Sequence, residues 1–247
     1  GDAGSSKFYL SLEDDLMRIF GGERISSLMT TLNIPEDQPI ENGLVTRAIE
    51  QAQVKVEGFH FDARKRLVEY DDVANRQRTI IYEIRREILD GKDVSKEVRE
   101  KLSIEVKNVI DLGSSEGNID HEGILVNFLE IVPFDDDSQK RLSGEIKKLN
   151  NREAIEDFLT GIINDVYKTR EEQITPETMR QVERFSYLSS IDRLWVEHLD
   201  SLDDLREGTG LRGGNDQERI ALYKSEAFGM FERLITQIDS EIVRRLF

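Results

Sequence analysis

The chain has 247 residues, with 34 Lys and Arg against 50 Asp and Glu, a formal net charge of −16 and no cysteine. The lack of cysteine excludes disulfides, thiolate metal sites and cysteine nucleophiles, and the negative charge opposes a general role in coating nucleic acid or anionic lipid. No apolar run approaches the roughly 18 residues that a membrane-spanning helix needs. The length allows one large domain or two of ordinary size.

Before residue 40 the sequence predicts short elements broken by glycine and proline. After a Gly- and Ser-rich start, a short extended piece precedes a helix that should end at Gly21 and Gly22. A second short helix is expected over residues 23–32, and Pro35 and Pro39 then break the chain. The N-terminus lacks the basic start and apolar core of a signal peptide.

The next segment predicts a single very long helix. Apolar or small residues recur at alternating steps of three and four, interrupted by polar Gln77, until Gly91 ends the pattern. The positions are Val45, Ile49, Ala52, Val56, Phe59, Ala63, Leu67, Tyr70, Ala74, Ile81, Ile84 and Ile88. A helix of about 45 to 50 residues is on the order of 70 Å long. Parts of its apolar seam should therefore accept other segments or another chain.

From Asp93 to about Thr175 the periodicity shortens and turns become frequent, which predicts a small inserted helical subdomain. A new helix should then start, because Thr175 can cap it and Pro176 suits its first turn.

Two long helical stripes follow. The first has ten members, Val182, Phe185, Leu188, Ile191, Leu194, Trp195, His198, Leu199, Leu202 and Leu205. The second has nine, Ile220, Tyr223, Ala227, Met230, Phe231, Leu234, Ile238, Ile242 and Leu246. Matching apolar faces predict an antiparallel hairpin, and the whole chain is expected to be all-α.

The connection between these arms is expected to run from Gly208 to Gln217. It holds four glycines, Gly208, Gly210, Gly213 and Gly214, whereas a two- to five-residue link would join packed helices. From spacing alone, a surface loop without function is the simpler interpretation.

This chain has three separated motifs, in residues 1–20, in residues 61–89 and in residues 191–213 with 223–235. They give it a resemblance to the SecA family, the ATP-driven motors of bacterial preprotein translocation. "IDRLWVEHLDSLDDLREGTGLRG" (191–213) with "YKSEAFGMFERLI" (223–235) resembles the two-helix finger, and "FDARKRLVEYDDVANRQRTIIYEIRREIL" (61–89) resembles the central scaffold helix. "GDAGSSKFYLSLEDDLMRIF" (1–20) is similar to the segment after the second motor domain. The resemblance implies a motor linker with short helices (1–40), a long scaffold helix (41–91), a helical wing domain (92–174) and a two-helix finger (175–247).

The resemblance also implies that residue 1 lies within a longer protein whose ATPase precedes it. The chain has no Walker lysine with its glycine loop, so it should not hydrolyse ATP itself. ATP and Mg²⁺ would bind the parent's motor domains, and no cofactor or metal is expected here. The expected location is the bacterial cytoplasm, peripheral at the inner membrane, with anionic lipid reached only through the parent protein and no nucleic acid partner.

In the family, the finger tip enters the SecY channel and contacts the unfolded preprotein. Leu211, Arg212 and Gly213 match the family's "LRG", and Gly214 and Asn215 complete the expected contact with preprotein and with SecYEG. The family usually has tyrosine where this chain has Gly214, and its usual "DP" before the second arm is missing. A mobile tip with one cation, suited to steering or backbone contact, is therefore expected in place of an aromatic grip.

Four further residues are expected to dock the motor domains. Arg64, Tyr70 and Asp71 match the family's surface between the scaffold helix and the motor. By themselves, the adjacent acids Asp71 and Asp72 indicate a solvated face, because neighbouring helical residues point about 100° apart. Trp195 is expected to be a core anchor, and the resemblance adds that its helix packs on the motor and restrains the ATPase. His198, on the same face, should be a hydrogen-bonded core histidine and no metal ligand.

Two functions remain open from the residues. The first is a mechanical, non-enzymatic part of a translocating ATPase, and the second is a free-standing antiparallel helical adaptor. A carboxylate enzyme is disfavoured because no acid pair has an activating neighbour in sequence. Uncovered apolar patches also predict that the chain forms a homodimer.

Overall fold

The computed structural model describes residues 43–115, 118–212 and 214–247, together with residues 2–6, 9, 11, 14, 15 and 19. The chain divides into two units, residues 1–71 and residues 72–247. The short elements predicted before residue 40 and the site residue Gly213 lie outside the described residues. The described part is almost entirely helical, which confirms the predicted all-α class.

The long helix predicted from Val45 is present as α2, which runs without a break from Gly43 to Leu89. In residues 72–89 its seam turns Gln77, Ile81 and Ile88 inward, whereas earlier seam residues such as Phe59 and Leu67 are at least half exposed. A continuous helix with a partly uncovered seam is what the three-four spacing predicts.

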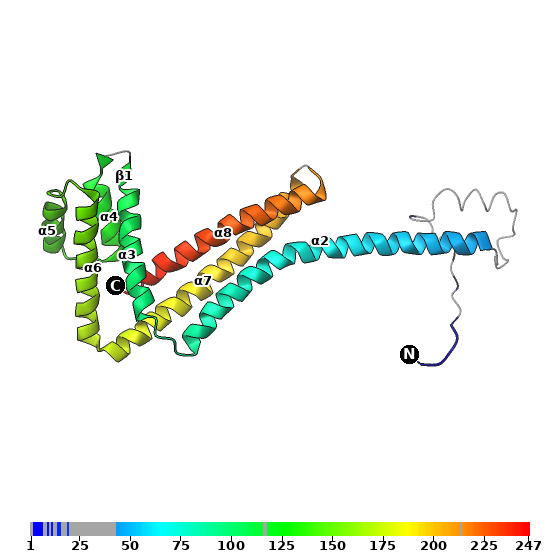
Figure 1. Ribbon diagram of the computed structural model, residues 1–247, viewed down its shortest axis with the longest axis horizontal. Helices are drawn as coiled ribbons and strands as arrows, with labels where there is room; N and C mark the ends of the chain where they lie inside the picture. The colour runs from blue at the N-terminus through cyan, green and yellow to red at the C-terminus, as the bar shows by residue number, and fades with distance from the viewer. Residues whose placement is uncertain are drawn as a thin grey trace. The chain divides into compact units, whose positions relative to one another are not determined.

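Residues 92–174 form four helices and a minimal β-hairpin (Figure 1). The elements are α3 (Ser95–Leu112), β1 (Ser114–Ser115), β2 (Asn118–Ile119), α4 (His121–Ile131), α5 (Asp136–Ile146) and α6 (Arg152–Ile174). Asp120, Asp135 and Asn151 cap α4, α5 and α6 by accepting hydrogen bonds from first-turn amides. The paired two-residue strands were not predicted, because two residues carry no period.

The hairpin is formed by α7 (Pro176–Leu211) and α8 (Asp216–Arg244). They run antiparallel, since Arg212 at the end of α7 pairs with Glu226 early in α8, and Arg193 in mid-α7 pairs with Glu241 near the end of α8. Figure 1 shows the two helices side by side along most of their length. Thr175 caps α7, as predicted, from a φ of 73°.

One core joins the hairpin base to the helices of residues 92–174. It includes Val98 and Leu102 of α3 and Ile242 and Val243 of α8, all completely buried. α3 packs on α8 and α7 as well as on α6. The inserted helices therefore share a core with the hairpin, and the predicted domain boundaries stay a prediction.

Two details of the hairpin differ from expectation. Phe185 was placed on the buried face of the first arm, but it is 69% exposed. The start of α7 instead buries polar residues, including Glu183, Ser186 and Ser190. The cause is that this end of α7 packs on α6 and α3 as well as on α8, so its buried face is not the single apolar stripe of an isolated hairpin.

Candidate functional site at the hairpin tip

The connection at the tip is shorter than expected, and the described residues on either side of Gly213 make local contacts. α7 continues through Gly208 and Gly210 to Leu211, and α8 begins at Asp216, so the ten-residue loop expected from Gly208 to Gln217 is wrong. Buried Thr209 lies between these glycines, and its hydroxyl donates to the Leu205 carbonyl at 2.9 Å. Glycine weakens a helix but does not end it when its neighbours hold the last turn.

The turn itself depends on Gly214 and Asn215. Gly214 has a φ of 123°, where a side chain would be strained and would also meet Glu218. Asn215 then starts α8 with a capping box: its side chain accepts from the Glu218 amide at 2.9 Å, and Glu218 accepts from the Asn215 amide at 3.2 Å. These residues therefore favour the start of α8 directly after Asn215.

The charges at the tip are paired. Arg212 Nη1 lies 2.7 Å from Glu226 Oε1, across the hairpin. Arg219 pairs with Asp216 and also donates to the Gly210 carbonyl at 3.4 Å. Leu211, by contrast, is 90% exposed at the end of α7. The tip, which was expected to carry one cation suited to steering or backbone contact, thus presents an apolar side chain beside an arginine whose charge is already paired.

A buried polar link connects the hairpin to α2. His198 Nε2 lies 2.8 Å from Gln77 Oε1, and Gln77 Nε2 donates to the Ala227 carbonyl at 3.0 Å. Because the amide group of Gln77 donates to Ala227, its oxygen is the acceptor, and His198 must carry its proton on Nε2. Burial lowers the pKa of His198 and favours this neutral form. The prediction of a hydrogen-bonded core histidine is confirmed.

Trp195 lies one turn before His198 and is 5% exposed, in the same core as Ile81 and Ile88 of α2. Its ring centroid is 5.6 Å from that of His198, and its indole Nε1 has no hydrogen-bond partner among the described residues. The prediction of a core anchor is confirmed. A second link, from Arg85 of α2 to Asp192 at 2.8 Å, lies one turn before Trp195.

The other three predicted docking residues lie on α2 in residues 1–71. Arg64 and Asp71 are exposed and Tyr70 is half-buried. Trp195 belongs to residues 72–247. The four residues are therefore found on two separately described units, and their common docking role stays a prediction.

The base of the hairpin holds a buried charged cluster that the sequence did not indicate. Glu183 is completely buried, accepts a hydrogen bond from the Tyr167 hydroxyl and lies 3.0 Å from Arg180 Nε. Arg180 also pairs with Glu171 at 2.6 Å. Burial raises the pKa of both Glu183 and Tyr167. This cluster joins α6 to α7. No sequence pattern indicated it, because Glu183 lies outside the predicted apolar stripe, where the side chain of an isolated helix would face solvent.

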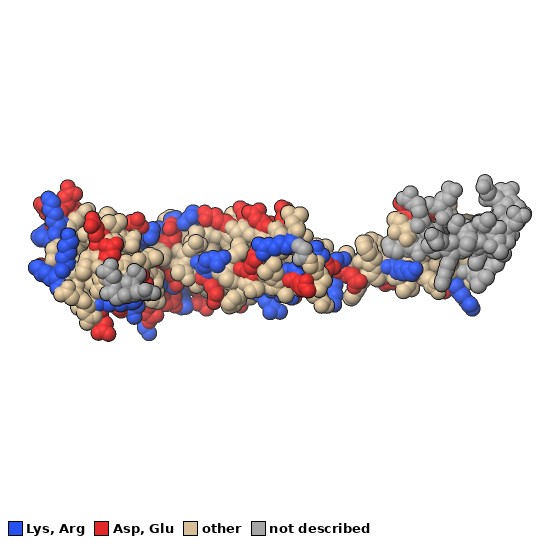
Figure 2. Space-filling model, turned by 90° about the horizontal axis from the view of Figure 1, so that it is seen from above, with Lys and Arg blue, Asp and Glu red and all other residues tan. Residues whose placement is uncertain are grey.

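Candidate metal-binding groups and candidate membrane spans are both absent from the described part of the chain. Residues 43–115, 118–212 and 214–247 contain no group of three acidic or histidine side chains able to hold a metal ion. None of their helices combines the length and hydropathy of a membrane span. Acidic and basic side chains are interspersed over residues 72–247 on the face seen in Figure 2.

Family comparison decides the relationship of this chain. Residues 39–247 match the SecA Wing and Scaffold domain, and residues 1–37 match the SecA P-loop domain. The chain belongs to the SecA family. Protein translocase subunit SecA of Desulfotalea psychrophila is 43% identical over 250 residues, and that of Symbiobacterium thermophilum is 41% identical over 256 residues. Both alignments cover the whole chain but only 29% and 28% of the relatives, so the chain spans less than a third of their length.

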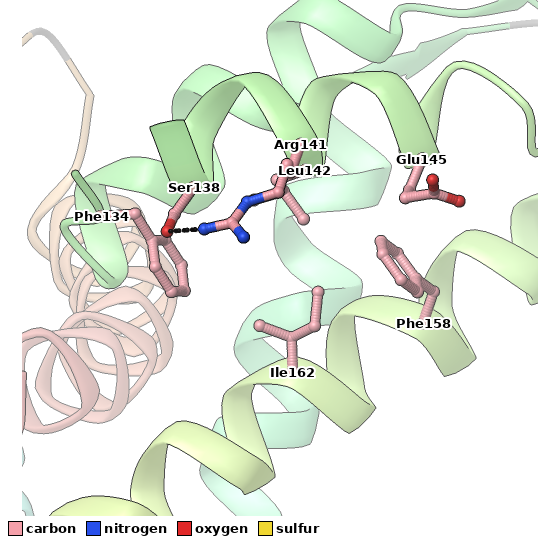
Figure 3. Close-up of a pocket in the computed structure, with 7 residues that line it drawn as sticks. All are labelled: Phe134, Ser138, Arg141, Leu142, Glu145, Phe158 and Ile162. Carbon is pink, nitrogen blue, oxygen red and sulfur yellow. Dashed lines mark hydrogen bonds between the residues drawn. The ribbon is translucent and has the colours of Figure 1, made fainter. Parts of the chain in front are cut away.

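The SecA match covers the helices of residues 92–174, where the sequence offered hardly any motif. An apolar hollow lies between α5 and α6 and is shown in Figure 3. It contains none of the residues predicted for the tip or for motor docking. The hollow is therefore separate from those predicted sites.

Proposed function

We propose that this chain is the non-catalytic scaffold, wing and finger part of a SecA protein translocase. In this role it carries ATP-driven movement of the motor domains to a preprotein at the SecYEG channel. Family membership supports a role in protein translocation. The observation that carries the finger role is a braced hairpin end that exposes Leu211.

Pushing an unfolded chain requires an end that does not bend away under load. Three features support such an end: the capping box at Asn215, the Arg212–Glu226 pair across the hairpin, and the Gln77–His198 link to α2. Leu211 would supply a contact that tolerates many sequences, because apolar burial is non-directional. Arg212 would act by holding the turn, since its charge is already paired.

The motor-docking role is proposed for Arg64, Tyr70 and Asp71 on α2 and for Trp195 in the hairpin core. Trp195 is too buried to form much of a surface, so it would act by fixing the helix that meets the motor. ATP and Mg²⁺ would bind the motor domains, and their hydrolysis would supply the movement. The whole protein would be cytoplasmic and peripheral at the inner membrane.

A photo-cross-linker tests the finger role most directly. Leu211 is the best position for it, because its side chain makes no buried contact, whereas Gly214 and Asn215 form the turn. The whole SecA protein would be stalled with a preprotein on membranes that contain SecYEG. We expect probe-dependent adducts with preprotein or with the channel. A probe at Val196, an exposed apolar residue on the flank of α7, is the control.

The same experiment separates this proposal from a helical adaptor. Equal capture from positions 211 and 196, or capture only of proteins outside the Sec machinery, would contradict the finger role and favour the adaptor. Adding the fragment to motor domains that lack it gives an independent test. Restraint of their ATP turnover is expected, and Trp195→Ala should weaken it more than Val196→Ala.

A further inference from the structure

The hollow in the wing region has an apolar interior with one arginine at its edge. Its apolar wall is formed by Phe134, Leu142, Phe158 and Ile162, and the space has a volume of about 220 Å³. Figure 3 shows Phe134 and Phe158 on opposite sides, with Ile162 projecting from α6 and Arg141 extending from α5 towards Ser138. Cavities of about 150 Å³ accommodate benzene, so this space suits an apolar group of similar or somewhat larger size.

The hollow is supported by ordered neighbours. Phe134 stacks on completely buried Phe128, with ring centroids 6.4 Å apart. Leu142 is 7% exposed in the main core. Phe158 and Ile162 are one turn apart on α6, so both project to the same side of that helix. An apolar ligand would therefore meet side chains whose positions are already set, which lowers the entropic cost of binding.

The polar groups at the edge favour an anion. Arg141 donates to the Ser138 hydroxyl at 3.2 Å, and among the described residues no carboxylate forms an ion pair with it. Glu145, the acidic residue of the lining, is already paired with Lys148 at 2.6 Å. The Ser138 hydroxyl donates to Asp135, whose carboxylate also caps α5. Arg141 is thus left with donors for a ligand, and a guanidinium fits the two oxygens of a carboxylate.

We propose that this hollow binds a small monocarboxylate with an unbranched apolar chain, of which a medium-chain fatty acid is the simplest example. The chain lies between Phe134 and Phe158, and the carboxylate accepts hydrogen bonds from Arg141. Polar groups along the rest of the ligand are disfavoured, because the apolar wall of the hollow offers them no hydrogen-bond partners. This site is independent of the hairpin tip and of the proposed translocation role.

Octanoate is the probe for the first test. It is titrated into the 247-residue chain at concentrations below micelle formation, and the isoleucine methyl signals are followed by NMR, with Ile162 identified through Ile162→Val. We expect a saturable shift of the Ile162 signal with a dissociation constant in the millimolar range or below. Absence of that shift, or unsaturable shifts of methyl groups throughout the chain, would overturn the proposal.

Charge recognition is tested with Arg141→Gln, and Lys140→Gln is the matched control on the same helix. Lys140 is exposed, carries the same charge and does not line the hollow. Arg141→Gln should weaken octanoate binding about tenfold, the loss expected for one charge-assisted hydrogen bond, and should leave octanol binding unchanged. Lys140→Gln should change neither. Equal weakening by both variants would mean general attraction by surface charge, which contradicts a built site.

Discussion

The tip and the base of the hairpin are held together by different physical means. At the tip, Arg212 and Glu226 form an ion pair whose side chains are 56% and 35% exposed. At the base, Glu183 is completely buried between α6 and α7 and is held by Tyr167 and Arg180. The same two-helix element thus ends in solvent-exposed polar contacts on one side and in a buried charged cluster on the other.

The two ends of the hairpin should therefore differ in how much they contribute to the stability of the fold. Exposed ion pairs contribute roughly 0 to 1 kcal/mol, because water and mobile side chains compete for each charge. Removing one member of a buried pair costs roughly 3 to 5 kcal/mol, because the remaining polar groups lose a partner away from water. The tip should therefore tolerate change with little loss of fold, whereas the base should not.

The largest effect is expected at the base. Glu183→Ala removes the acceptor of the Tyr167 hydroxyl and one of the three carboxylates that pair with Arg180, and it opens a cavity. We expect the free energy of unfolding to fall by about 3 kcal/mol, measured by urea denaturation. Glu183→Gln keeps the volume and an acceptor and should cost less.

The control for this prediction is Glu197→Ala on the same helix. Glu197 is 59% exposed at its side chain and pairs with Arg193 at 3.0 Å. Its removal should cost less than about 1 kcal/mol. Equal losses from Glu183→Ala and Glu197→Ala would show that burial does not distinguish the two ends of the hairpin.

A smaller effect is expected at the link between α2 and the hairpin. Gln77→Leu leaves the His198 ring donor and the Ala227 carbonyl without their buried partner. The unfolding free energy should fall by about 2 kcal/mol. In combination with His198→Leu the loss should be less than the sum of the two single losses, because one unsatisfied donor is removed. Strict additivity in this double-mutant cycle would contradict the link.

The pH dependence of stability offers a further test of the same link. Burial lowers the pKa of His198 in the folded state, so protonation is easier in the unfolded chain. The contribution of neutral His198 to the free energy of unfolding is complete above the pKa of about 6.5 that histidine has in the unfolded chain. It is lost as the pH falls towards the lower pKa of His198 in the folded state. His198→Asn should remove this loss. Urea unfolding at intervals from about pH 7.5 to 5 should therefore show the variant and the original chain converging at low pH.

Residue spacing predicted the long helices well, because the three-four spacing of apolar residues within one stretch is enough to identify a helix and its buried face. The continuous α2 and the buried face of α8, including Tyr223, Ala227 and Leu234, follow the three-four pattern. His198 and Trp195 were also placed correctly in the core. These are local properties that a single helix carries in its sequence.

Features that depend on several helices meeting were not predictable in this way. Phe185 is exposed and Glu183 buried because α6 and α3 cover a side of α7 that a hairpin alone would leave open. Gly208 and Gly210 indicated a loop, but buried Thr209 keeps the last turn of α7 helical. At the candidate site, the sequence identified the tip residues but not the partner of Arg212, since Glu226 lies fourteen residues away across the turn.

The smallest effect on stability is expected at the tip. Arg212→Gln removes an exposed pair and should change the unfolding free energy by about 0.5 kcal/mol or less. Glu226→Gln should do the same, because each variant removes the same interaction. If the pair holds the turn during translocation, both variants should slow preprotein transport by a similar factor while stability stays nearly constant. If the arginine charge itself contacts the preprotein, Arg212→Gln should slow transport and Glu226→Gln should not, because the latter leaves the cation free. Transport rates of the whole SecA protein with each variant distinguish a bracing role from a contacting one.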